Sequence, residues 1–174
     1  RNFNTFVKTI FHLEQHKQIL SSISTILKVD KINLEIKLKE ICCLLKQEKS
    51  NYDWVGFYFA QPSTKTLHLK AFAGIPTDHT LIPFGKGICG QVALSNESFV
   101  VDDVQAEENY ISCNIDVKSE IVIPLFLNKI NIGQIDIDSN TPKAFNETDT
   151  LLLEEINNKI SNYMLSNKLS INIS

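Results

Sequence analysis

The chain has 174 residues, of which 43% are hydrophobic and 21% charged, the balance of an ordinary globular protein of one domain. Its net charge of -3 gives no electrostatic reason to expect nucleic acid or a membrane surface as a partner. No apolar run approaches the ~20 residues that cross a bilayer, and residues 1–10 lack the layout of a secretory signal. We expect a single domain over 1–174, with N-terminal helices over 1–50 and a core over 51–165.

The four cysteines are too few for a disulfide framework in a chain of this size, which favours a reducing, cytoplasmic location. Cys42 and Cys43 lie in the helical pattern "LKEICCLLKQE", where both are expected to be small core residues. No cysteine pair has CxxC spacing and the four histidines are scattered, so no metal site is expected.

The first half of the chain changes from helical to strand patterns. Apolar spacing predicts one helix within "FNTFVKTIFHLEQHKQILSSISTIL" and a second from Asn33, a candidate N-cap, to about Glu48. "DWVGFYFA" is aromatic and β-branched, and "TLHLKAFAG" alternates apolar and polar residues. With the turn sequence "PSTK" between them, these two segments predict a β-hairpin.

The second half predicts another hairpin between loops and helices. The segment 74–87 reads as a loop, "ICGQVALSN" as a short helix, "SFVV" as a short strand and 102–118 as a long polar loop. "SEIVIPLFL" and "NIGQIDIDS" predict two paired strands, and a final helix follows with Asn146 or Thr148 as its cap. This order indicates an α+β fold, in which an antiparallel sheet carries helices on one face.

Two cysteines lie in or near the predicted loops. Cys89 stands where the short helix should begin, and the unpaired N–H groups and dipole there lower a thiol pKa and favour the reactive thiolate. Taken alone, a cysteine in such a glycine-rich turn is more often structural. Cys113 lies in the polar loop, where exposure is expected, with Lys118 as the nearest cation in the sequence. Structural and functional interpretations of Cys113 both stay open.

Three acids and two aromatic residues form a second group of candidates. Asp136 and Asp138 lie two apart on a strand and therefore share a face, and hairpin pairing would bring Glu120 close to them. The acids are either a solvated strand end or a pocket for an ammonium group or, with less support because no histidine is near, a metal ion. Trp54 and Tyr58 share a strand face as core residues or as the walls of a small apolar pocket.

Six motifs together resemble one protein family. "WVGFYF", "IPFGKGICGQVA", "VVDDV", "ISCN", "SEIVIPL" and "IGQIDIDS" follow one another as in GAF domains of the free methionine-(R)-sulfoxide reductase type, over about residues 52–153. The resemblance implies a GAF-like α+β fold, with a central antiparallel sheet, helices packed on one face and a loop-covered ligand pocket on the other.

The resemblance also implies an activity, the reduction of free methionine-(R)-sulfoxide by a thiol/disulfide mechanism. It implies that Cys113 attacks the sulfoxide sulfur and that Cys89 closes a disulfide with it. The implied substrate-binding residues are Glu120, Asp136, Asp138, Trp54 and Tyr58. The three acids would hold the substrate ammonium and the two rings would surround its methyl-sulfur end. No bound cofactor is implied, since a dithiol protein such as thioredoxin would supply the electrons.

The chain departs from the family pattern at three places. A cysteine that is common before "IPFG" is absent, with His79 nearest its position, and Gln105 and Asn114 replace a histidine and an aspartate. A GAF domain that binds a small molecule as a sensor, without catalysis, is therefore an alternative. A scaffold or homodimer module with paired N-terminal helices is a further one. For the reductase, we expect Cys89 and Cys113 on the same pocket rim, with Cys113 on the more mobile element.

Overall fold

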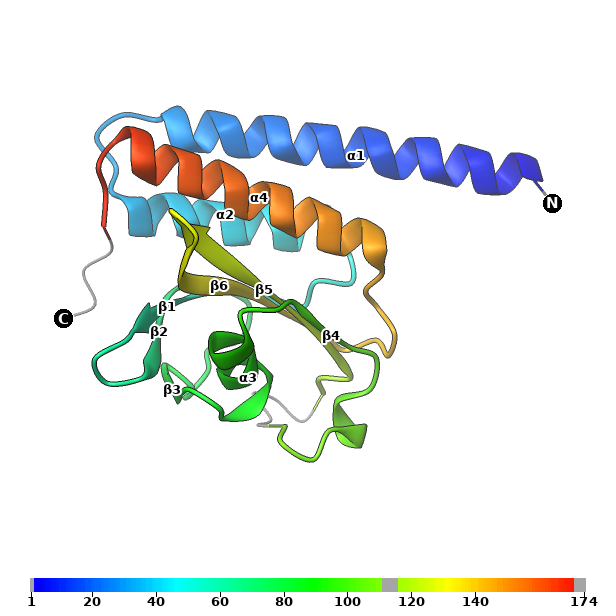
Figure 1. Ribbon diagram of the computed structural model, residues 1–174. Helices are drawn as coiled ribbons and strands as arrows, with labels where there is room; N and C mark the ends of the chain where they lie inside the picture. The colour runs from blue at the N-terminus through cyan, green and yellow to red at the C-terminus, as the bar shows by residue number, and fades with distance from the viewer. Residues whose placement is uncertain (1, 111–115, 171–174) are drawn as a thin grey trace.

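The computed structural model describes residues 2–110 and 116–170, with side chains from residue 10 onward (Figure 1). The predictions for Cys113 and Asn114 therefore lie outside the described residues. Among the helices of the described part of the chain, none combines the length and the apolar character needed to cross a membrane.

A six-stranded antiparallel sheet forms the centre of the molecule, in the order β3-β2-β1-β6-β5-β4. Its strands are β1 Trp54–Gln61, β2 Thr66–Ala73, β3 Leu81–Pro83, β4 Phe99–Val101, β5 Ser119–Leu127 and β6 Ile130–Ser139. Both predicted hairpins are present, as β1–β2 and β5–β6. The prediction of a loop over 74–87 is wrong in part, because β3 pairs there with β2. A three-residue strand that ends in proline is too short to show periodicity.

Three helices form a layer over one face of the sheet, and the short helix lies on the opposite face (Figure 1). The layer consists of α1 Asn2–Lys28, α2 Leu34–Glu48 and α4 Glu147–Ser166. Helix α3, Gly87–Ser95, packs on the other face, and a 3-10 turn, η1 Val104–Ala106, follows β4. The α+β prediction with helices on one face is confirmed for the three long helices.

Side-chain caps fix the starts of α2 and α4. The side chain of Asn33 accepts a hydrogen bond of 2.9 Å from the backbone N–H of Ile36. Asn146, rather than Thr148, caps α4, and Asp149 completes a reciprocal capping box with it. Both cap assignments agree with the sequence, which offered Asn146 first.

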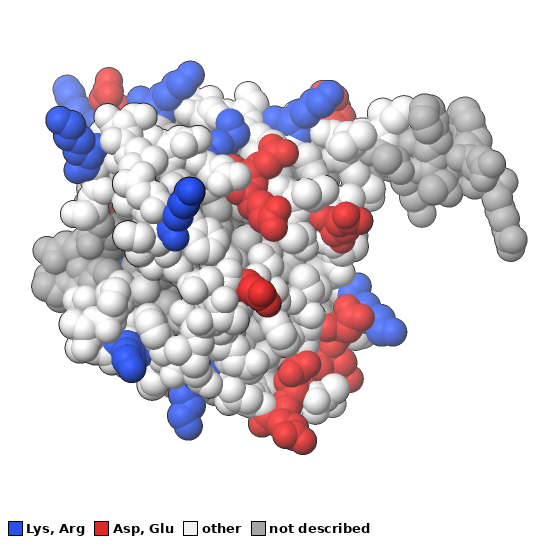
Figure 2. All heavy atoms as spheres, viewed as in Figure 1, with Lys and Arg blue, Asp and Glu red and all other residues white. Residues whose placement is uncertain are grey.

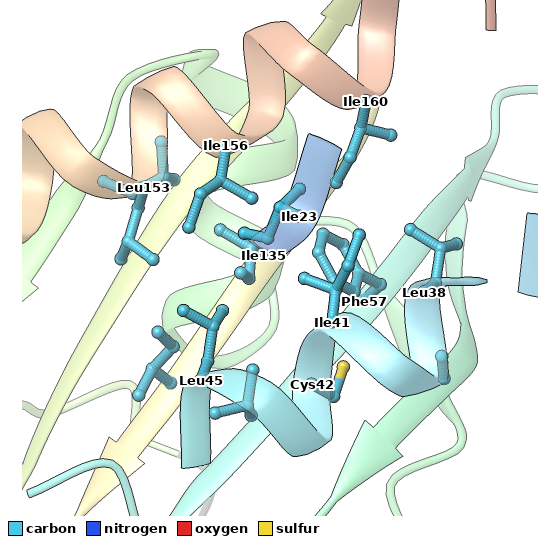
Figure 3. Close-up of a cluster of buried hydrophobic side chains, with 14 of the residues drawn as sticks. Ile23, Leu38, Ile41, Cys42, Leu45, Phe57, Ile135, Leu153, Ile156 and Ile160 are labelled. Carbon is cyan, nitrogen blue, oxygen red and sulfur yellow. The ribbon is translucent and has the colours of Figure 1, made fainter. Parts of the chain in front are cut away.

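The main core lies between the sheet and the three-helix layer, and Figure 3 shows part of it. Val55, Phe57 and Phe59 of β1 point into this core, whereas Trp54 and Tyr58 belong to the cluster on the α3 side. Cys42 is buried here, but Cys43 is exposed, so the prediction of two core cysteines is wrong for Cys43. Successive helix residues are about 100° apart around the axis, and α2 turns one of them away from the sheet.

Candidate functional site

The three predicted acids meet on the α3 face of the sheet. In the β5–β6 hairpin Glu120 lies opposite Asp138, and Val122 lies opposite Asp136. Their exposed fractions are 5% for Glu120, 1% for Asp136 and 2% for Asp138. The interpretation as a solvated strand end is therefore wrong. Figure 2 shows the acidic and basic side chains on one face of the molecule, and the acid trio, at most 5% exposed, is buried rather than part of such a surface.

Burial is the main cause that raises the pKa of each acid. The pKa of Glu120 lies well above its usual range, because Asp136 and Asp138 add their negative charges to the cost of burial. Burial raises the pKa of Asp136 to about 7, although hydrogen bonds from Cys89 and Glu120 oppose this shift. Burial, followed by the charges of Asp136 and Asp53, also raises the pKa of Asp138 well above its usual range. The trio therefore holds protons near neutral pH and favours a positive ligand that would replace them.

Cys89 joins this acid trio from the first turn of α3. Its side chain is 4% exposed and its thiol donates a hydrogen bond to Asp136. The sulfur and one carboxylate oxygen from each of Glu120 and Asp136 lie within 4.8 Å of one another. Gln134 donates to the Cys89 carbonyl at 3.2 Å, which ties the start of α3 to β6. Cys89 is thus buried on the face of the sheet away from the three-helix layer.

Asn109 connects the loop before Cys113 to the turn before α3. Its Nδ2 donates to the Gly85 carbonyl at 2.9 Å, and its Oδ1 accepts from the Gly87 N–H at 3.4 Å. Gly85 and Gly87 have φ of 85° and 62°, which glycine adopts without strain. Asn109 precedes Cys113 by four residues, a span of at most ~14 Å. This clamp was not predicted, because a single asparagine in a polar loop belongs to no recognisable sequence pattern. The shared rim of Cys89 and Cys113 stays a prediction.

Trp54 and Tyr58 lie side by side on the α3 face, as their spacing predicted. Their ring centroids are 6.3 Å apart, and Trp54 also stacks on Phe72 at 5.8 Å. The Trp54 indole donates to the Ile75 carbonyl at 3.1 Å, and the Tyr58 hydroxyl donates to the His79 carbonyl at 2.8 Å. The two polar groups therefore hold the loop between β2 and β3 against the sheet.

Two glycines make room for the Trp54 ring. A Cβ on Gly56 would lie 2.1 Å from Trp54 Cη2, and a Cβ on Gly74 would lie 2.7 Å from Trp54 Cδ1. A larger residue at either position would displace the indole. Gly56 was a usable sequence signal that the predictions did not include. A glycine inside an aromatic strand often marks a place where another group approaches the backbone closely.

A cleft of about 760 Å³ opens beside Trp54 and Asp138. Its lining residues are Lys46, Asp53, Trp54, Gly74, Ile75, Pro76, Thr77, Asp116, Val117, Asp138 and Asn140. Tyr58 is fully buried and does not line this cleft. Volumes of this order accept small-molecule ligands. Three lining residues were not among the predicted site residues: Asp53 just before β1, Asp116 in the loop before β5, and Asn140 just after β6.

A second, much smaller cavity of about 20 Å³ lies at the thiol. Its lining residues are His79, Ile82, Lys86, Gly87, Ile88, Cys89, Glu120 and Asp136. The acid trio therefore faces two spaces, with Asp138 at the cleft and Glu120 and Asp136 at the small cavity. Within the described residues, Cys89, Glu120 and Asp136 are the group whose side-chain atoms could hold a metal ion.

The chain resembles known proteins in both sequence and fold. Residues 34–164 match the GAF domain family. GAF domain-containing protein A of Dictyostelium discoideum is 34% identical over 143 residues, which cover 82% of this chain and 88% of that protein. Free methionine-R-sulfoxide reductase of Escherichia coli is 32% identical over 119 residues, 68% of this chain and 70% of that protein. The structure of free methionine-R-sulfoxide reductase from Neisseria meningitidis with its substrate is 33% identical, with a TM-score of 0.81, 88% of this chain covered and 90% of that one.

Proposed function

This chain belongs to the GAF-domain family, and from that premise we propose that it reduces the R-sulfoxide of free methionine to methionine. The observation that carries the proposal is the buried acid trio, joined to the Cys89 thiol and open to a cleft through Asp138. The similarity to free methionine-R-sulfoxide reductases of two bacteria supports the same activity.

The acid trio accounts for selection of a free amino acid. An α-ammonium group that enters beside Asp138 would replace the protons of the trio with a full positive charge. A methionine sulfoxide within a peptide has no such ammonium and would leave the buried acids unpaired. Sites built to bind a polar group discriminate strongly against analogues that lack it. We therefore expect little activity on peptide-bound methionine sulfoxide.

The proposed chemistry uses Cys113 and Cys89 in sequence. The Cys113 sulfur bonds to the sulfoxide sulfur, while the sulfoxide oxygen takes up two protons and leaves as water. The Cys89 sulfur then bonds to the Cys113 sulfur and expels methionine with the electron pair of the broken bond. Overall, the sulfoxide gains two electrons, two thiols become a disulfide, and their protons end in the water. A thioredoxin-like dithiol protein would reduce the disulfide for the next turnover.

Asp136 has a role in the proton transfers of this scheme. It already accepts a hydrogen bond from the Cys89 thiol, and its pKa of about 7 allows it both to take and to give a proton near neutral pH. The Asn109 clamp supports this scheme, because it holds Asn109, four residues before Cys113, beside the start of α3.

The test compares substrates under two reductants. We expect NADPH consumption, coupled through thioredoxin and its reductase, with the free R epimer and not with the S epimer or with N-acetylmethionine-R-sulfoxide. Methionine release with dithiothreitol separates a failed thioredoxin partner from a failed enzyme. Cys43→Ser, on the helix side, is the matched control and should retain turnover. Release of methionine from the free R epimer no faster than in Cys113→Ser would refute the proposal.

The role of Cys89 has its own test. If Cys89 resolves the intermediate, Cys89→Ser should consume about one equivalent of sulfoxide as the covalent Cys113 intermediate and then stop under thioredoxin, whereas the wild type continues. Mass spectrometry of the wild type after substrate treatment should find the Cys89–Cys113 disulfide. Unchanged thioredoxin-driven turnover in Cys89→Ser would assign resolution to an external thiol.

A binding domain without catalysis is the second candidate. The cleft favours it, because Cys89 does not line the cleft, and a small molecule could bind there without contact with that thiol. This candidate requires saturable binding of a small molecule with no change in the redox state of Cys89. A substrate-dependent disulfide in the experiment above would exclude it.

A further inference from the structure

The small cavity at the thiol has the composition of a metal site. Cys89 comes from α3, Glu120 from β5 and Asp136 from β6, and one ligand atom from each lies within 4.8 Å of the other two. All three side chains are at least nine-tenths buried. The cavity of about 20 Å³ that they line exceeds the ~10–15 Å³ that a water-sized particle needs.

A second observation points to a ligand at this place. The Oδ1 atom of Asp136 is fully buried and has no hydrogen-bond partner among the described residues. Buried carboxylate oxygens without a partner are costly, so a positive group in the cavity would stabilise this one. Lys86 lines the same cavity but is an exposed residue, and the salt bridges of the described residues do not include Asp136.

We infer that Cys89, Glu120 and Asp136 bind one zinc-like divalent cation when substrate is absent. A thiolate selects softer ions such as Zn²⁺ over Mg²⁺ or Ca²⁺, which prefer oxygen ligands. Zinc bonds of ~2.3 Å to sulfur and ~2.0 Å to oxygen separate two tetrahedral ligands by ~3.5 Å, so small side-chain movements suffice. These three residues supply three ligands, and a water molecule would complete the tetrahedral coordination that zinc prefers.

The bound cation would block the reduction of methionine sulfoxide, a consequence that rests on the proposed function. Zinc binds the thiolate form of cysteine, so binding displaces the thiol proton of Cys89 and releases at least about one proton for each ion. The ion then occupies the resolving thiol and two of the acids that receive the ammonium. Metal and substrate therefore bind in competition, and the metal acts as a reversible inhibitor.

Cobalt and zinc titrations test the site directly. Protein reduced with a phosphine is titrated with Co²⁺, and thiolate coordination is read from its charge-transfer absorption in the near ultraviolet. Zn²⁺ binding is followed by calorimetry in buffers of different ionisation enthalpy, which counts released protons. Cys89→Ser and Asp136→Asn remove ligands, while Cys43→Ser removes an exposed thiol on α2 as the matched control.

We expect one equivalent of metal in the wild type and in Cys43→Ser, with the thiolate band in both. Cys89→Ser should lose the band, and each ligand variant should bind Zn²⁺ at least ~10-fold more weakly. Saturating free methionine, which carries the same ammonium group but cannot oxidise Cys89, should displace the ion. Absence of saturable binding, or a band that persists in Cys89→Ser, overturns the inference. Reductase activity measured with a chelator is independent of this outcome, so the two proposals fail separately.

Discussion

The helix-covered face of the sheet and the face beneath α3 use the same strands but bury different side chains. Toward the helices, β5 and β6 present isoleucines such as Ile121 and Ile137, which pair across the hairpin. Toward α3, the same pair of strands presents Glu120 and Asp138 at the adjacent register. The alternation of a strand thus places a core and a reactive site back to back.

The buried charges of the two faces differ in their partners. On the helix side Lys49 and Asp149 form an ion pair of 2.9 Å, and both are nearly buried. On the α3 side the acid trio has no ion pair within the described part of the chain. The paired charges on the helix side therefore stabilise the fold. The buried acids on the α3 side cost stability without an ion-pair partner among the described residues, and they remain available to bind a ligand.

The largest effect should come from the helix side. Phe57→Ala removes a fully buried ring and should lower the free energy of unfolding by about 3–5 kcal/mol, because a cavity remains. Denaturant unfolding measures the change. Phe126→Ala is the control, because Phe126 is 39% exposed and should lose far less. Equal losses would show that the helix side does not dominate stability.

A smaller loss of stability should come from the close contact between Gly56 and the Trp54 ring. Gly56→Ala places a Cβ 2.1 Å from the indole and should cost about 1–3 kcal/mol, with a weaker apparent affinity for substrate. The double variant Gly56→Ala/Trp54→Phe should recover part of the stability, since the smaller ring clears the methyl group. No recovery would mean that Gly56 acts through the backbone and not through the ring.

On the α3 side a polar substitution should stabilise the protein. Asp136→Asn removes an acid that burial disfavours as a charge, so we expect a gain of roughly 1–2 kcal/mol at pH 8 and much weaker ammonium binding. Thermal unfolding and substrate titration measure the two changes. Asp30→Asn, at an exposed position, is the control. A loss of stability in Asp136→Asn at pH 8 would contradict the comparison.

The pH dependence of stability follows from the same acid. Its pKa is raised to about 7 in the folded state, whereas an unfolded aspartate titrates near ~4. The folded state therefore binds more protons between these values, and stability should fall as pH rises from about 4 to 7. Denaturant unfolding over this range should give a shallower slope for Asp136→Asn. Identical slopes would remove Asp136 from the explanation.

The smallest effect should come from a helix end. Asn146→Ala removes the capping box of α4 and should cost about 1 kcal/mol, with substrate affinity unchanged. Asn146→Asp, which retains an acceptor, should restore most of the loss. Altered substrate affinity in Asn146→Ala would show that the two faces are coupled.

The sequence predicted what depends on local pattern. The approach of Glu120 to Asp136 and Asp138 followed from strand alternation and one hairpin, and the structure confirms it. Their burial did not follow, because α3 and the loops that cover them are separate in the sequence. The Asn109 clamp was not predicted either, because single hydrogen bonds between segments more than 20 residues apart leave no pattern in the sequence.

Trp54 is the single tryptophan of the chain, and it lies at the cleft rather than in the main core. The intrinsic fluorescence of the protein therefore originates beside the site. Emission should respond to ligands, to ionisation of nearby Asp138 and to release of the Ile75 loop before the helices unfold. Fluorescence and far-ultraviolet dichroism would then follow different parts of one molecule, and a lag between the two signals would measure how independently the cleft opens.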